Sequence, residues 1–178
     1  METKTTYTRG QLSVLVILRL LIGWHFLYEG VVKLWSSSWS AGGFLMDSEG
    51  PFAGLFYALA ANPTVLAVVD FLNVWGLILI GLGLIMGSFT RIATIAGIVL
   101  LAFYYLSHPP LISTSYALPS EGSYLLVNKN LIELFALAVL YYFPTSHVFG
   151  LDRFFFNRRS TLKPSETAKT NKKTKVSV

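Results

Sequence analysis

Residues 12–34 read LSVLVILRLLIGWHFLYEGVVKL, and this stretch decides the fold class. It is long and apolar enough to cross a bilayer, since a helix needs about 20 residues to span the hydrocarbon core. Yet it carries four ionisable side chains, Arg19, His25, Glu29 and Lys33. Each such group costs about 2.5–3.5 kcal/mol at the centre of a membrane helix, so these side chains are expected to face a bundle interior and to mark a functional site.

The composition of the whole chain is that of an integral membrane protein. Of its 178 residues, 53% are hydrophobic and 13% are charged, and the mean hydropathy is +0.57. The chain has no cysteine, which excludes disulfides and any thiol-based redox cycle carried by this chain alone. The net charge of +5 does not indicate a nucleic-acid partner, because eight of the 14 Lys and Arg residues follow residue 150 in a tail that offers no folded basic face.

Four apolar stretches are long enough to span the membrane, which predicts an all-α, integral membrane four-helix bundle. The predicted spans lie near residues 11–34, 64–88, 90–107 and 125–147. The N-terminal residues 1–10, the connection between the second and third spans and the C-terminal tail all contain Lys or Arg, whereas the long connections at 35–63 and 108–124 contain none. The positive-inside rule therefore predicts that both termini lie in the cytoplasm.

Two further segments are predicted outside the spans. Pro51–Ala61 is apolar but only about 16 Å long as a helix, so it is expected to form a short interfacial helix that begins at its proline. The segment before it, 35–43, is expected to be a flexible interfacial loop. The basic residues 156–178 have almost no apolar content and are expected to be a disordered cytoplasmic tail.

The polar residues of all four spans converge on one side of the membrane. Depths estimated from the helical rise place them in the extracytoplasmic half, where we predict one outward-facing polar pocket. Glu29 and Glu133 are the candidate catalytic proton acceptors. The candidate binding residues are Arg19, His25, Lys33, Asp70, Asn73, Tyr104, His108 and Lys129. Arg19 lies deeper than the rest, and we expect its side chain to reach Glu133 or to hold backbone carbonyl groups.

Structural roles remain open for several of these residues. Lys33 and Lys129 also fit snorkelling at the interface, and Tyr104 fits an ordinary aromatic belt. A structural ion-pair network would explain Glu29, Asp70 and Glu133 as well. No spacing of His, Asp and Glu indicates a metal site.

Four short motifs resemble the DoxX family, a family of small four-span bacterial membrane proteins. They are RLLIGWHFLYEGVVKL at 19–34, GSFTRIA at 87–93, NKNLIE at 128–133 and GLDR at 150–153. The positions that match these motifs are Arg19, Gly23, Gly30, Lys33, Arg91, Glu133 and Asp152. Many DoxX proteins have a glutamate in the second span, but here the nearest polar residue is Asn73, so that glutamate's role does not carry over. The resemblance implies a DoxX-like domain over residues 11–155 and a bacterial inner-membrane location.

The family includes DoxD, the membrane subunit of thiosulfate:quinone oxidoreductase, which implies a quinone-linked role as part of an oxidoreductase complex. No haem or flavin motif is recognisable, so a membrane or extracytoplasmic partner protein would supply the redox centre. The alternative is a non-catalytic membrane anchor or assembly subunit of a larger envelope complex. Transport has less support, because there is no broken-helix pair or internal repeat. The sequence does not indicate an oligomeric state.

Overall fold

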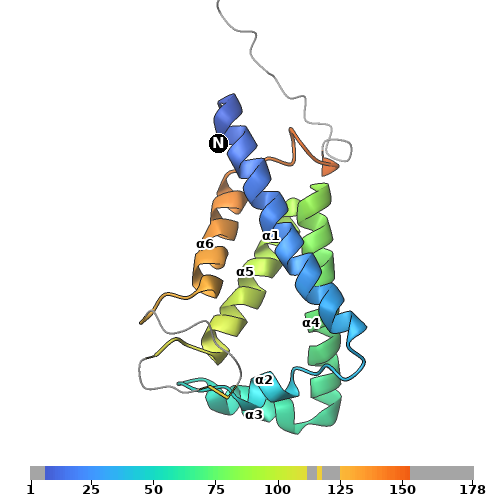
Figure 1. The fold of residues 1–178 in the computed structure, drawn as a ribbon, viewed down its shortest axis with the longest axis vertical. Coiled ribbons are helices and arrows are strands. Elements are labelled where there is room, and N and C mark those ends of the chain that lie inside the picture. Colours follow the sequence, from blue (N-terminus) through green and yellow to red (C-terminus); the bar gives the residue numbers. More distant parts are fainter. Residues whose placement is uncertain (1–6, 112–115, 118–124, 153–178) are drawn as a thin grey trace, which may run out of the picture.

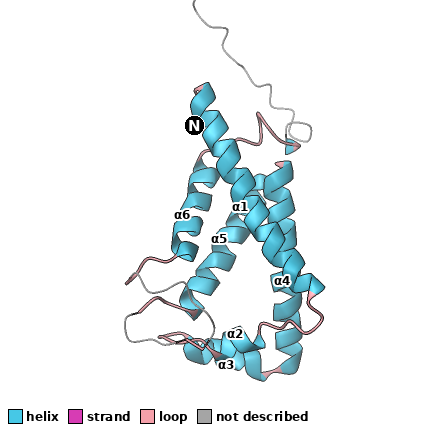
Figure 2. Cartoon of the chain, viewed as in Figure 1, coloured by secondary structure: helices cyan, strands magenta, loops and turns pink. Residues whose placement is uncertain are grey.

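The computed structural model describes residues 7–111, 116–117 and 125–152, and every regular element among them is a helix (Figure 2). This confirms the predicted all-α class. The predicted tail at 156–178 lies outside the described residues. The helices, labelled in Figure 1, are α1 (Arg9–Trp35), α2 (Gly42–Met46), α3 (Ala53–Ala61), α4 (Pro63–Met86), α5 (Thr90–Ser107) and α6 (Lys129–Tyr142).

Within the described residues, three helices have the length and composition of membrane spans: α1, α4 and α5. Helix α6 lies inside the predicted fourth span, 125–147, but has only 14 residues, a length of about 21 Å. Its ends explain the difference. The Asn128 side chain accepts a hydrogen bond from the Leu131 amide and so fixes the start of the helix. Pro144 follows the C-cap residue and disfavours a helical conformation there.

Local signals also fix the ends of the longer helices. Thr8 and Gln11 form a capping box at the start of α1. Asn62 accepts hydrogen bonds from two amides at the start of α4, and Pro63 occupies its first turn. Gly87 ends α4 with φ of 66°, a left-handed conformation that glycine adopts at little cost.

Helices α1 and α4 pack closely because glycines line their contact. A Cβ atom added at Gly81 would lie 2.5 Å from the Leu27 amide nitrogen and 2.7 Å from the Gly23 carbonyl oxygen. On the α1 side, Gly23 and Gly30 face α4 in the same way. Such small residues let membrane helices approach each other backbone to backbone.

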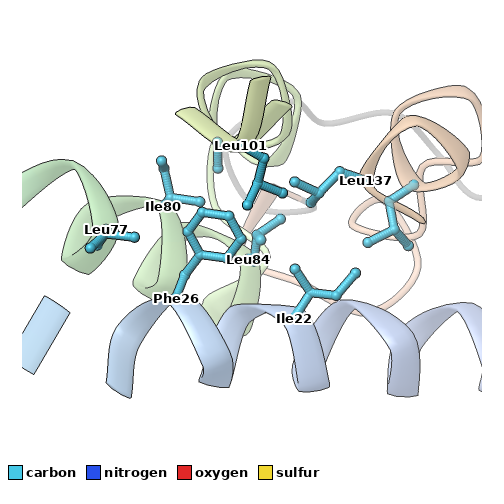
Figure 3. Close-up of a cluster of buried hydrophobic side chains, with 9 residues drawn as sticks. Ile22, Phe26, Leu77, Ile80, Leu84, Leu101 and Leu137 are labelled. Carbon is cyan, nitrogen blue, oxygen red and sulfur yellow. The ribbon is translucent and has the colours of Figure 1, made fainter. Parts of the chain in front are cut away.

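One hydrophobic core joins all four long helices. Figure 3 shows Ile22 and Phe26 of α1 facing side chains of the other three helices. Those labelled in the figure are Leu77, Ile80 and Leu84 from α4, Leu101 from α5 and Leu137 from α6. The core places α6 against α1 and α5, and this arrangement creates the contact between α1 and α6 at which the candidate site lies.

The short helices α2 and α3 lie together at one end of the bundle (Figure 1). Helix α3 falls within the predicted short helix, Pro51–Ala61, whereas α2 was not predicted, because its glycines indicated a loop. Packing explains α2, since Ala41 and Leu45 are buried against Phe56 of α3. At the opposite end, the Leu151 and Asp152 amides donate to carbonyl oxygens at the end of α4, at 3.1 and 2.9 Å.

Candidate functional site

A histidine–glutamate pair joins α1 to α6. His25 Nδ1 lies 2.8 and 3.0 Å from the two carboxylate oxygens of Glu133. The His25 side chain is 43% exposed, whereas that of Glu133 is 13% exposed. Because an ionised carboxylate only accepts hydrogen bonds, Nδ1 carries the hydrogen and Nε2 is left for another group. The pair therefore resembles the acid–base pairs in which a carboxylate orients an imidazole.

The pair lines an open, shallow groove of about 390 Å³. Lys129 lines the same groove, one helical turn before Glu133 on α6. The remaining lining is apolar and comprises Leu18, Leu21, Ile22, Ile132 and Ala136. On α1, Leu18 lies about 10 Å along the helix from His25, so the polar groups occupy one end of the groove and apolar side chains the other. This arrangement fits an amphipathic molecule with a polar head and an apolar tail.

A second polar cluster lies around Lys33 at the end of α1. The Lys33 ammonium is 3.6 Å from a Glu29 carboxylate oxygen, and it also lies 5.4 and 5.6 Å from the ring centres of Trp39 and Tyr104. The Asn73 amide donates a hydrogen bond of 2.7 Å to the Tyr104 hydroxyl. The cation thus lies against aromatic faces, a favourable position for an ammonium removed from water.

The structure assigns Asp70 and His108 to other contacts. Asp70 accepts a hydrogen bond of 2.7 Å from the Ala41 amide, directly before α2. His108 Nε2 lies 3.6 Å from a carboxylate oxygen of Asp47, the residue that directly follows α2. The predicted site residues therefore form separate clusters instead of one pocket. Asp70 and His108 contact the residues that flank helix α2.

The predicted contact between Arg19 and Glu133 is wrong. Instead, Arg19 Nη1 donates to the Thr145 hydroxyl at 3.1 Å, and Nη2 donates to the Phe149 carbonyl at 2.6 Å. The other expectation, that Arg19 holds backbone carbonyl groups, is confirmed at Phe149. The side chain points to the segment after α6 because this segment folds back over the end of α4.

Asp152 organises the same end of the bundle, a role that sequence reasoning missed. Its carboxylate accepts hydrogen bonds from the Phe89 amide at 2.7 Å and from the Thr90 amide and hydroxyl at 3.3 and 2.8 Å. Burial acts to raise the pKa of Asp152, but hydrogen bonds from Thr90, Ser146 and the backbone outweigh it and hold that pKa below its usual value. The GLDR motif marked this residue without showing its partners.

Two other site features were also invisible to sequence reasoning. Asp47 and Ser48, which follow α2, meet His108 and Ser107 at the end of α5. No periodic pattern links these positions, which lie 59 or more residues apart. Among the described residues, no group of three His, Asp or Glu side chains is placed to hold a metal ion.

Comparison with known protein families matches residues 14–109 to DoxX. The chain belongs to the DoxX family. Together with its apolar helices, this makes it a membrane protein in contact with the lipid bilayer. The DoxX match runs from α1 to the end of α5 and includes His25 and Lys33, whereas Glu133 lies beyond it. No curated protein and no solved structure matches the chain.

Proposed function

We propose that this DoxX protein is a quinone-linked membrane subunit of an oxidoreductase complex, and that the groove between α1 and α6 binds the quinone. The observation that carries the proposal is the His25–Glu133 pair at the polar end of an otherwise apolar groove. Ligand sites typically combine an apolar lining with a few polar groups that fix orientation. A carboxylate-oriented imidazole is also a suitable group for proton exchange near neutral pH.

The geometry supports the following roles for the site residues. Glu133 holds Nδ1 of His25 and so orients the ring, while Nε2 exchanges a hydrogen with the bound head group. Lys129 adds positive charge at the same end of the groove. We keep Glu29, one turn beyond His25 on α1 and paired with Lys33 outside the groove lining, as the proposed second proton acceptor. A bound quinone would supply two-electron, two-proton redox chemistry that this cysteine-free chain lacks.

The proposal extends to location and partners. The start of α1 and residues 143–152 lie at the end of the bundle away from α2 and α3 (Figure 1). With the positive-inside rule, this arrangement supports cytoplasmic termini in a bacterial inner membrane, with the polar end of the groove toward the extracytoplasmic side. A protein partner on that side or in the membrane would carry the redox centre.

Binding of a short-tailed quinone to the purified protein in lipid nanodiscs tests this function. Calorimetry should show binding to the wild type. In Glu133→Gln the affinity should fall, because the carboxylate that orients the His25 ring toward the head group is replaced by a neutral amide. Leu21→Trp should obstruct the groove, whereas Leu20→Trp, at the neighbouring exposed position outside the groove lining, is the matched control.

Two outcomes would overturn the proposal. One is the absence of quinone binding in the wild type and of bound quinone in extracts of the purified chain. The other is equal affinity in Leu21→Trp and Leu20→Trp, which would place any binding outside the groove. Unchanged growth and respiration of a host that carries Glu29→Gln would remove Glu29 from the mechanism. Co-purification of an envelope complex without quinone binding would support the anchor alternative.

A further inference from the structure

We propose that the lipid bilayer is thinned locally around the start of α6, so that lipid head groups and water reach the polar end of the groove between α1 and α6. Figure 1 shows that α6 stops well short of the end of the bundle at which α2 and α3 lie. The thinning follows from helix lengths and contacts, and it does not depend on which molecule occupies the groove.

Helix α6 is too short to cross the hydrocarbon core of a bilayer. Its 14 residues extend about 21 Å, whereas the core is about 30 Å thick. By comparison, the 24 residues of α4 extend about 36 Å. Any tilt of α6 shortens its reach across the membrane further. About 9 Å or more of a core of ordinary thickness would therefore lie beyond one end of α6.

The C-terminal end of α6 is fixed near the turn that joins α4 to α5. In the segment after α6, the Leu151 amide donates to the Met86 carbonyl at the end of α4, at 3.1 Å. The hydroxyl of Thr90, the first residue of α5, donates to the Ser146 hydroxyl at 2.8 Å. A turn between two spans lies at the membrane interface, because irregular backbone is excluded from lipid-exposed positions in the core. The missing length is therefore at the start of α6.

Helix α5 gives an independent measure of the same distance. The Tyr105 hydroxyl donates to the Leu126 carbonyl, just before α6, at 2.8 Å. From Thr90 to Tyr105, α5 extends about 22 Å. The residues that precede α6 are thus held about 22 Å from the turn, in agreement with the length of α6 itself.

Groups that hydrocarbon excludes lie at this depth. Residues 125–127 are not helical, and irregular backbone exposed to lipid does not occur within the core. Asn128 caps the helix, and Lys129, which begins it, is exposed. On α1, Tyr28 lies on the next turn after His25 and is 57% exposed, as is typical of a ring at the membrane interface.

A thinner bilayer removes this conflict. Each ångström of mismatch has a modest cost, whereas an irregular backbone segment or an exposed lysine in hydrocarbon has a large one. The lipids beside α6 therefore adjust their length, and residues 125–129 remain at the level of the head groups.

Thinning changes the surroundings of the His25–Glu133 pair. Glu133 lies about 6 Å along α6 from its start. In a bilayer of uniform thickness it would lie about 15 Å from either surface of the core, which is the centre of the membrane. In the thinned bilayer the pair lies one helical turn below the head groups, where water and a polar head group reach it from the interface.

Cysteine accessibility tests the thinning, because the chain has no native cysteine. Leu126→Cys, before α6, and Leu72→Cys, on α4, form a matched pair, since the two leucines are 58% and 62% exposed. Leu72 lies about 21 Å along α4 from Met86, so both positions are equally far from the turn that joins α4 to α5. Phe135→Cys, at a position that is 63% exposed and about 9 Å inside α6, is the control for a thiol in hydrocarbon.

Each full-length variant is treated with a polar methanethiosulfonate reagent in nanodiscs of dioleoyl phosphatidylcholine. We expect Leu126→Cys to react many-fold faster than Leu72→Cys and Phe135→Cys. In a phosphatidylcholine with shorter chains the Leu72→Cys rate should rise, which shows that this thiol reacts once the interface reaches it.

Two results would overturn the proposal. Equally slow reaction of Leu126→Cys and Phe135→Cys would show that lipid or a second copy of the chain covers the residues before α6. Equally fast reaction of Leu126→Cys and Leu72→Cys would show that the whole bundle lies in a thin bilayer, without local thinning. Should Leu126→Cys fail to fold, Leu125→Cys, at a position that is 56% exposed, replaces it under the same criteria.

Discussion

Replacement of Gly81 by alanine tests the closest contact in the bundle. A Cβ atom at this position would lie 2.5 Å from the backbone nitrogen of Leu27, about 0.9 Å short of the 3.4 Å at which ordinary contact begins. Backbone cannot rotate away as a flexible side chain can, so α1 and α4 must separate. A gap of about 0.5–1 Å forfeits about a quarter to a half of the dispersion energy of each affected contact.

The expected cost is that of an overpacked core, about 1–3 kcal/mol. Gly76→Ala is the matched control, because it lies on the same helix and an added Cβ there would meet nothing within 4 Å. Both variants gain the same helix-forming preference, so their difference isolates the packing strain. For a chain of this length that difference corresponds to about 2–12 °C in Tm.

Thermal unfolding of the two purified variants, followed by size-exclusion fluorescence in one detergent, measures this difference. We expect Gly81→Ala to unfold at the lower temperature, with Gly76→Ala at or above the wild type. Equal Tm values for the two alanine variants would refute the close backbone contact between α1 and α4.

Three further predictions concern the ends of the bundle. Arg19→Met should lower the free energy of unfolding by about 1–3 kcal/mol, because buried acceptors lose their donor. This decrease should exceed that of Thr145→Val, which removes only one of the two hydrogen bonds of Arg19. Equal decreases in the two variants would contradict this prediction. Because its pKa is lowered, Asp152 should stabilise the fold above the ordinary aspartate pKa of about 3.9 and lose this effect as the pH falls through its own pKa. The Tm difference between wild type and Asp152→Asn should therefore shrink in acid, and a constant difference would exclude the charge as its cause. A cysteine in Ser38→Cys should be labelled by an impermeant reagent from outside the cell, whereas one in Ser160→Cys should not. The reverse pattern would show that the topology is opposite to the predicted one.

Hydrophobic length predicted most of the helices but not the partners of their polar residues. The helices at 9–35, 63–86 and 90–107 closely follow three predicted spans, because membrane helices satisfy their own backbone hydrogen bonds. Helix α2 was not predicted from the sequence, because five residues that include two glycines show no local pattern typical of a helix. It forms because Leu45 is buried and because Asp70 and Ser107 hold its flanks.

The sequence by itself determined that this chain crosses a membrane as helices and that ionisable side chains lie within them. Both follow from local composition, which needs no knowledge of what packs against what. Only the tertiary structure decided the pairs: His25 with Glu133, and Arg19 with Thr145 and the Phe149 carbonyl. The physical reason is that a polar group buried away from water pairs with whichever group the packing brings within about 3 Å. In these pairs the partner lies more than 100 residues away in the sequence, where no local pattern can indicate it.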